Sequence, residues 1–130
     1  MRKRAHAFFS LSLLPLVMLA LGFCSIAAAS LVPAEYRPQS GFIPDGAEHA
    51  VAYFMIGSLS ALIISPKVAR GMIVCLLAVF AGLMELGQID IPHRSCSLED
   101  FLSSSGGGLA GVLFVVTLQR LSMRRFESAT

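Results

Sequence analysis

The chain has 130 residues, the length of one ordinary domain, but apolar residues make up 55% of it and charged residues only 14%. Soluble domains carry about a quarter charged residues, and the mean hydropathy here is +0.75, so a water-soluble enzyme with its own large core is almost excluded. The net charge of +2 gives no reason to expect a nucleic-acid partner. The expected partner is the lipid bilayer.

Four long stretches of the chain are nearly free of charge. Residues 5–34, 49–66 and 101–119 contain no Asp, Glu, Lys or Arg, and residues 71–89 contain only Glu85. A bilayer core of about 30 Å needs roughly 20 helical residues, whose backbone groups must be hydrogen-bonded internally. The sequence therefore predicts an all-α fold, an integral membrane four-helix bundle with spanning helices at 7–31, 47–65, 70–89 and 99–120.

Basic residues predict the orientation of these helices. An even number of spans puts both termini on one side, which then holds eight of the ten Lys and Arg residues: Arg2, Lys3, Arg4, Lys67, Arg70, Arg120, Arg124 and Arg125. By the positive-inside rule that side is cytoplasmic. We therefore expect a basic cytoplasmic N-terminus at 1–6 and a cytoplasmic tail at 121–130.

The first span has an alternative interpretation. Met1-Arg2-Lys3-Arg4, a long apolar run and then three alanines follow the order of regions in a secretory signal peptide. The uncharged run is longer than a usual signal-peptide core, which favours an uncleaved signal-anchor over 7–31. Cleavage would leave the topology of the other three spans unchanged.

The sequence offers no metal site and no cofactor motif. It has no HExxH, P-loop or GxSxG pattern, and Cys24, Cys75 and Cys96 lack metal-ligand spacing. We expect Cys75 to be buried in mid-helix as a small apolar residue. Cys24 and Cys96 both fall near the outer face, where a disulfide is one alternative.

A run of three serines and three glycines at 103–108 would be a linker in a soluble protein. Inside an uncharged span it favours a helix face of small residues, on which Gly107 and Gly111 have the GxxxG spacing that lets a neighbouring backbone approach. We expect these two glycines to pack helices together. A flexible gate is the alternative.

Two polar clusters interrupt the apolar pattern at the outer ends of the spans. Asp45 and Glu48 have the spacing of a capping box at the start of the second span, and Ser97 and Asp100 repeat it at the start of the fourth. Asp45 and His49 are four residues apart and share a helical face. Capping alone would explain most of these residues without a ligand.

Glu85 is harder to explain. It lies about one turn inside the outer end of the third span, where an ionised carboxylate is costly without a partner. Gln88 shares its face at i+3, and Arg94 is the only basic side chain in the loop that follows. The simplest prediction is a Glu85–Arg94 ion pair held by Gln88, serving either as scaffold or as part of a ligand or proton site.

Taken in order, these residues resemble the VanZ-like family, whose namesake is an accessory protein of glycopeptide resistance associated with teicoplanin. The resemblance lies in the order and spacing of the motifs over about residues 44–115 and implies a VanZ-like domain over 44–120. Two positions depart from the family pattern, since Gly46 replaces a basic residue and Ser104 replaces Asn. The resemblance implies a multi-pass protein of the bacterial inner membrane but supplies no reaction. The motifs are Asp45-x-x-x-His49 with Tyr53, Glu85-x-x-Gln88, Pro92-x-Arg94, Ser97-x-x-Asp100 and Gly107-x-x-x-Gly111.

Three functional hypotheses follow. The first is a non-enzymatic protein that binds a polar envelope ligand, such as a lipid-linked cell-wall precursor or a glycopeptide, with Arg94 meeting a phosphate or carboxylate. The second is a membrane enzyme acting on a lipid-linked or cell-wall substrate, with Glu85 or His49 as general base. The third is a structural assembly partner whose polar residues fix the helix register. The candidate ligand-binding residues are Asp45, His49, Glu85, Gln88, Arg94 and Asp100.

Overall fold

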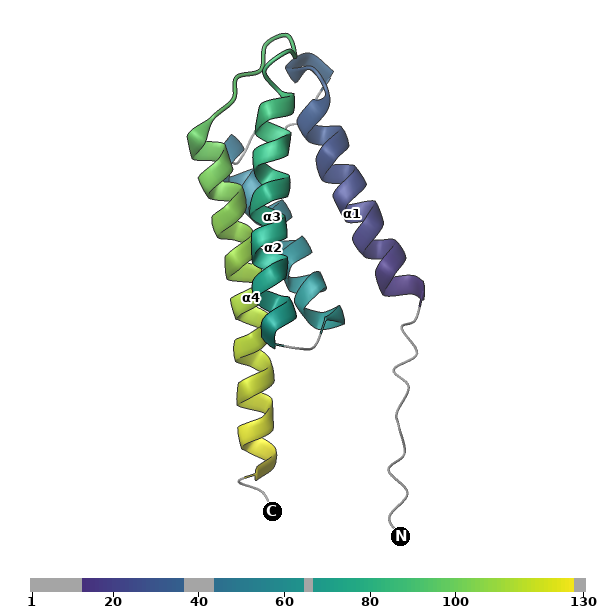
Figure 1. Cartoon of the computed structure of the whole chain (residues 1–130), viewed down its shortest axis with the longest axis vertical. Coiled ribbons are helices and arrows are strands. Elements are labelled where there is room, and N and C mark those ends of the chain that lie inside the picture. Colours follow the sequence, from purple (N-terminus) through teal and green to yellow (C-terminus); the bar gives the residue numbers. More distant parts are fainter. Residues whose placement is uncertain (1–12, 37–43, 65–66, 128–130) are drawn as a thin grey trace.

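The computed structural model of the chain describes residues 13–36, 44–64 and 67–127. It contains α1 (Leu13–Leu31), a short 3-10 helix (Ala34–Tyr36), α2 (Asp45–Ile63), α3 (Lys67–Gly87) and α4 (Leu98–Glu127) (Figure 1). These four α-helices are each long and apolar enough to cross a membrane. The prediction of an all-α four-helix membrane bundle is confirmed, and the chain is a multi-pass membrane protein.

The helices alternate in direction along the bundle. At one end, which we call the Glu85 end, α1 and α3 finish and α2 and α4 begin; the opposite end, where α2 finishes and α3 begins, we call the Arg70 end (Figure 1). The first and last described helical residues, Leu13 and Glu127, both lie at the Arg70 end. The predicted basic segment 1–6 and the first part of the predicted helix 7–31 lie outside the described residues.

Helix α4 is longer than expected. The predicted span ended at 120, but the helix continues to Glu127 and includes the first part of the predicted tail. Leu121, Met123, Arg124 and Arg125 are good helix formers, and no Gly or Pro interrupts them. The helix has 30 residues. At about 1.5 Å per residue, it is longer than a bilayer core is thick.

Helices α2 and α4 form the most closely packed pair, and glycines make this possible. A Cβ atom at Gly107 would collide with the backbone of Ala50, and one at Gly111 would collide with the backbone of Phe54. From the other side, a Cβ atom at Gly57 would collide with the backbone of α4. The serine and glycine run is therefore a helical contact surface in which backbone meets backbone, as in small-residue packing of membrane helices.

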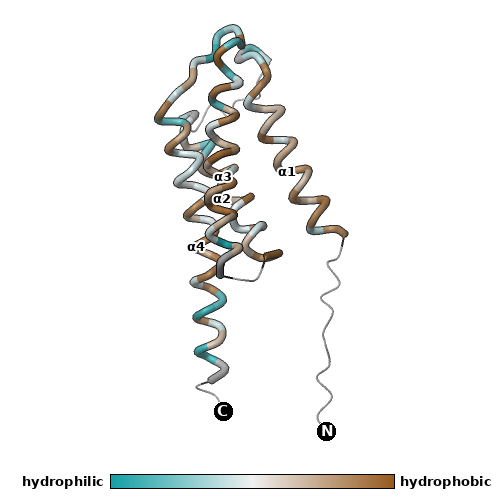
Figure 2. The backbone as a smooth tube through the Cα atoms, in the orientation of Figure 1, coloured by the Kyte–Doolittle hydropathy of each residue, from teal (hydrophilic) through white to brown (hydrophobic). Residues whose placement is uncertain are grey.

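Many large apolar side chains are exposed on the outside of the bundle, as expected for a protein whose solvent is lipid. Figure 2 shows hydrophobic residues along all four helices. Ile73, Leu77 and Ala81 recur at helical spacing and are the buried face of α3. Cys75 falls between them on the outer face and is exposed, so the prediction that it is buried is wrong. Cys24 and Cys96 are likewise free and exposed, and form no disulfide.

Helix α1 packs at the edge of the bundle against α2 and α3. Its Phe23 ring meets Phe80 of α3 edge to face, with ring centroids 5.0 Å apart. Only Ile26 and Ser30 of this helix are buried. The core is consequently built mainly by α2, α3 and α4.

Candidate functional site

The candidate residues predicted from the sequence come from separate helices and meet at the Glu85 end. His49 lies in the second turn of α2, Glu85 in the last turn of α3, Gln88 directly after that helix, and Asp100 in the first turn of α4. Arg94 lies in the loop between α3 and α4. The backbone of Asp45 begins α2, whereas its side chain lies outside the described part of the chain.

Six polar side chains among the described residues at this end are buried: Ser30 of α1, and five that we call the polar cluster, His49, Tyr53, Glu85, Gln88 and Ser104. Glu85 is 4% exposed and Gln88 is 2% exposed, which is unusual for residues that are normally at the surface. Glu85 also lies close enough to the Tyr53 phenol for a direct electrostatic interaction.

Sequence reasoning did not select Ser104 as a site residue, although it is only 2% exposed. It precedes Gly107 by three residues and Gly111 by seven, so it shares the face of α4 that packs on α2. That spacing is the signal that would have placed Ser104 in the buried interface. Tyr53 entered the sequence analysis only through the family motif.

Glu85 acts as a helix cap across two helices. Its Oε2 accepts a hydrogen bond of 2.9 Å from the backbone N–H of Ser97. Ser97 in turn caps α4, because its Oγ accepts from the backbone N–H of Asp100 at 3.2 Å. In a capping box the Asp100 carboxylate would bind the Ser97 amide; here a carboxylate from α3 does so, and it ties the end of α3 to the start of α4.

Arg94 holds the end of α1. Its Nη2 donates to the carbonyl of Ala29 at 2.8 Å and its Nε donates to the carbonyl of Val32 at 3.3 Å. The last carbonyls of a helix lack intrahelical partners and carry the negative end of its dipole, so they attract a guanidinium group. Glu85 and Arg94 therefore have separate partners in place of the ion pair that we predicted, because α1 ends beside the loop.

The loop itself brings Arg94 to α1 through successive turns. The backbone N–H of Gln88 donates to Glu85, that of Ile91 to Gln88, and that of Arg94 to Ile91, in steps of three residues. His93 has a φ of 59°, a left-handed conformation that is uncommon for residues other than glycine.

The N-cap of α2 lies one residue before Asp45, where the predicted capping box of Asp45 and Glu48 would have begun. Pro44 occupies the N-cap position of α2, with no side-chain cap, and its carbonyl accepts from the amides of Ala47 at 2.9 Å and Glu48 at 3.2 Å. Proline fixes φ near −65° and needs no N–H partner, so it is well suited to the start of a helix. Asp45 is therefore already inside the first turn.

The first turns of α2 and α4 approach each other at Gly46. A Cβ atom built there would lie 3.2 Å from the Ser103 Oγ and 3.5 Å from the Asp100 Oδ1. Asp100 is half-buried, and its carboxylate faces Gly46 of α2. Glu85, and not Asp100, accepts the hydrogen bond from the Ser97 amide. The absence of a side chain at position 46 leaves room for this approach.

Gln88 carries the one feature of the cluster that the fold does not satisfy. Its Nε2 is buried and has no hydrogen-bond partner among the described residues. An unsatisfied buried donor costs about 1–3 kcal/mol, and such groups are rare. This amide can donate to an acceptor that enters the Glu85 end.

Known proteins give no further guidance. No family model, curated protein or solved structure matches the chain. Among the side chains that the structure describes, no three His, Cys, Asp or Glu residues are grouped closely enough to hold a metal ion.

Proposed function

We propose that this chain is a VanZ-like integral membrane protein of the bacterial inner membrane that binds a polar envelope ligand at the Glu85 end without catalysing a reaction. The ordered motifs between residues 44 and 115 support the family. The convergence of His49, Glu85, Gln88 and Asp100 on one end of the bundle supports a site there. The ligand is a lipid-linked cell-wall precursor or a glycopeptide, both of which present many hydrogen-bond acceptors.

The observation that carries this proposal is the unsatisfied Nε2 of Gln88. A cluster that only fixed helix register would lose free energy by burying a donor without a partner, because an apolar side chain of the same shape would serve better. A ligand carbonyl or phosphate oxygen would satisfy this donor. Ligand binding then explains why Gln88 is polar, which the contacts of Glu85 with Ser97 and of Arg94 with Ala29 do not.

The contacts divide the predicted site residues into two roles. Glu85 and Arg94 are engaged by the protein itself, through the Ser97 amide and the α1 carbonyls, so they position the site. Gln88, His49 and Asp100 are the groups that we assign to the ligand. This changes the role that we predicted for Arg94, which was to meet a phosphate or carboxylate directly.

The test uses purified protein with a lipid-linked cell-wall precursor, and separately teicoplanin, each carrying a photoactivatable diazirine group. Gln88→Leu keeps a similar volume, removes the unsatisfied donor and is expected to reduce crosslinking by about tenfold, the effect of one lost hydrogen bond to a charged group. Gln119→Leu makes the same change at the Arg70 end and should leave crosslinking at the wild-type level. Equal crosslinking of folded Gln88→Leu and wild type would refute ligand binding at this site.

A structural role is the second candidate, and the Glu85–Ser97 and Arg94–Ala29 contacts favour it. Under this alternative, Gln88→Leu would raise the free energy of unfolding in detergent and change nothing else. Under the proposed function the same variant would raise stability and also lose crosslinking. Measuring the free energy of unfolding and the crosslinking on one preparation therefore distinguishes the structural role from ligand binding.

A further inference from the structure

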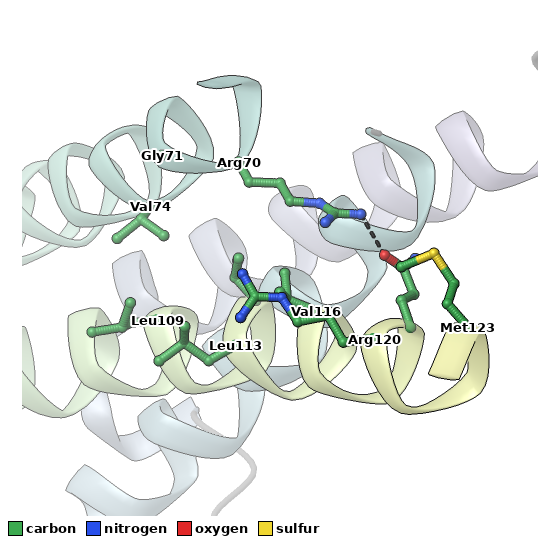
Figure 3. A pocket seen from close by; sticks show the side chains of 10 residues that line it. Arg70, Gly71, Val74, Leu109, Leu113, Val116, Arg120 and Met123 are labelled. Atoms are coloured by element: carbon green, nitrogen blue, oxygen red, sulfur yellow. Dashed lines mark hydrogen bonds between the residues drawn. The ribbon is translucent and has the colours of Figure 1, made fainter. Parts of the chain in front are cut away.

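A groove of about 370 Å³ lies between α3 and α4 at the Arg70 end (Figure 3). Its walls are mostly apolar, and the residues that matter below are Val74, Leu109, Leu113 and Val116. Leu113 is 54% exposed, so the groove opens on the outer surface of the bundle. In a membrane this surface faces lipid.

The polar end of the groove is cationic. Arg70 reaches from α3 across to α4, where its Nη2 donates to the Oε1 of Gln119, and Arg120 lines the same groove from α4 (Figure 3). The Nε of Arg70 is buried and has no hydrogen-bond partner in the described part of the chain. Guanidinium groups have donors in a fixed fork and bind phosphate oxygens well. A negatively charged group that accepts a hydrogen bond would satisfy the Arg70 Nε and the positive charge at this end of the groove.

The groove also has the length and placement of a lipid. It extends along α4 from Leu109 to Met123, fourteen residue steps or about 21 Å. One leaflet contributes about 15 Å of hydrocarbon, with the headgroup beyond it. The arginines lie near the first residue of α3, where the helix enters the bilayer, and the apolar walls continue toward mid-membrane.

We propose that this groove binds one anionic phospholipid of the surrounding leaflet. The lipid phosphate accepts hydrogen bonds from Arg70 and Arg120, and one acyl chain lies along Leu109, Leu113 and Val116. The cationic end selects an anionic headgroup, and the apolar walls open on the bilayer, so the lipid enters sideways from its own leaflet. Basic pockets between membrane helices bind anionic headgroups for the same physical reason.

The chain contains no tryptophan, so one introduced tryptophan reports on a single position. Leu113→Trp places the reporter in the groove, and Leu76→Trp places it on the exposed lipid face of α3, outside the groove. Each protein is reconstituted in vesicles of phosphatidylcholine and phosphatidylglycerol, with one of the two lipids brominated to quench fluorescence. The ratio of quenching gives the relative binding constant of the anionic lipid at each position.

At Leu113→Trp we expect phosphatidylglycerol to bind at least about fivefold more tightly than phosphatidylcholine, the order of magnitude for one basic residue. At Leu76→Trp the ratio should be close to one. Adding Arg70→Gln and Arg120→Gln together should bring the Leu113→Trp ratio close to one, whereas Arg124→Gln, an exposed arginine outside the groove, should not change it. Equal binding of the two lipids, or a preference that survives the double substitution, would overturn the proposal.

A second variant tests the groove without changing its charge. No atom lies within 4 Å of a Cβ atom built at Gly71, so Gly71→Leu can fold and its side chain enters the groove. We expect phosphatidylglycerol to raise the melting temperature of the wild-type protein in detergent. We expect Gly71→Leu to lose this rise and to lower the phosphatidylglycerol preference at Leu113→Trp. If a second copy of the chain occupied the groove, both brominated lipids would be excluded from Leu113→Trp at high protein density, which would also overturn the proposal.

Discussion

Glu85, in the last turn of α3, and Ser97, directly before α4, together complete the cap that begins α4: the Glu85 carboxylate accepts from the Ser97 amide at 2.9 Å, and the Ser97 hydroxyl accepts from the Asp100 amide. A carboxylate that is 4% exposed near a membrane surface is thus stabilised by a backbone donor that has no other partner in the helix. The cost of burying Glu85 is offset by a hydrogen bond to a charged acceptor.

Replacing Glu85 with leucine should destabilise the bundle. The Ser97 amide would lose its acceptor, and we expect the free energy of unfolding to fall by about 1.5–3 kcal/mol. Glu85→Gln keeps an acceptor oxygen and should cost less. Unfolding in a denaturing detergent titration measures both, and Glu99→Gln, in the exposed first turn of α4, is the control that should stay within experimental error of wild type.

Replacing Arg94 with alanine should release the end of α1 without unfolding the other helices. The carbonyls of Ala29 and Val32 would lose their donor, and the amides in the last turn of α1 should exchange hydrogen faster by about tenfold or more, as for a lost charge-assisted hydrogen bond. Hydrogen exchange followed by mass spectrometry reports this. Unchanged exchange in α1, with Arg124→Ala as the reference, would contradict the role that we give Arg94.

The α2–α4 contact should tolerate no side chain at Gly107 or Gly111. Gly107→Ala and Gly111→Ala each place a Cβ atom against the backbone of α2, and overpacking of this kind costs about 1–3 kcal/mol. Gly106→Ala is a matched control one residue away, because no atom lies within 4 Å of its Cβ position. That control should be neutral or more stable by up to about 1 kcal/mol, since alanine favours helix. Equal melting temperatures for all three variants would disprove backbone contact as the basis of this interface.

His93→Gly should stabilise the loop. His93 has a φ of 59°, where an L-residue pays about 1 kcal/mol that glycine does not. Part of this gain is lost because glycine also has more freedom in the unfolded chain, so we expect a rise of roughly 0.5 kcal/mol. Ser95→Gly, in the same loop without a positive φ, should only destabilise. A fall in stability for His93→Gly as large as that for Ser95→Gly would show that the left-handed turn is not strained.

The sequence was sufficient for the architecture because a bilayer imposes strong rules. Charge-free stretches located all four helices, and the spacing of Gly107 and Gly111 indicated a close-packing face, since both signals are local in the chain. The end of the bundle at which the polar residues meet followed from helix direction alone. The Ser97 cap at α4 also followed from a local motif.

The partners within that end could not be predicted, because they depend on contacts between distant segments. Nothing in the sequence places the end of α1 beside the loop after α3, so Glu85 was paired with Arg94, the only basic side chain in that loop. The N-cap of α2 was placed at Asp45, one residue too late, because Pro44 takes that position. The groove at the Arg70 end was missed because nothing in the sequence brings Arg70 of α3 beside Arg120 of α4.

The contact between Arg94 and Ala29 joins residues 65 positions apart, and this separation sets an order on assembly. Helix α1 is synthesised first but buries only two residues, and its fastening at the Glu85 end is made after α2 and α3. The helix that enters the bilayer first therefore receives its hydrogen-bonded partner at this end only after two more helices have followed, and until Arg94 arrives it is held by its packing against α2 and α3.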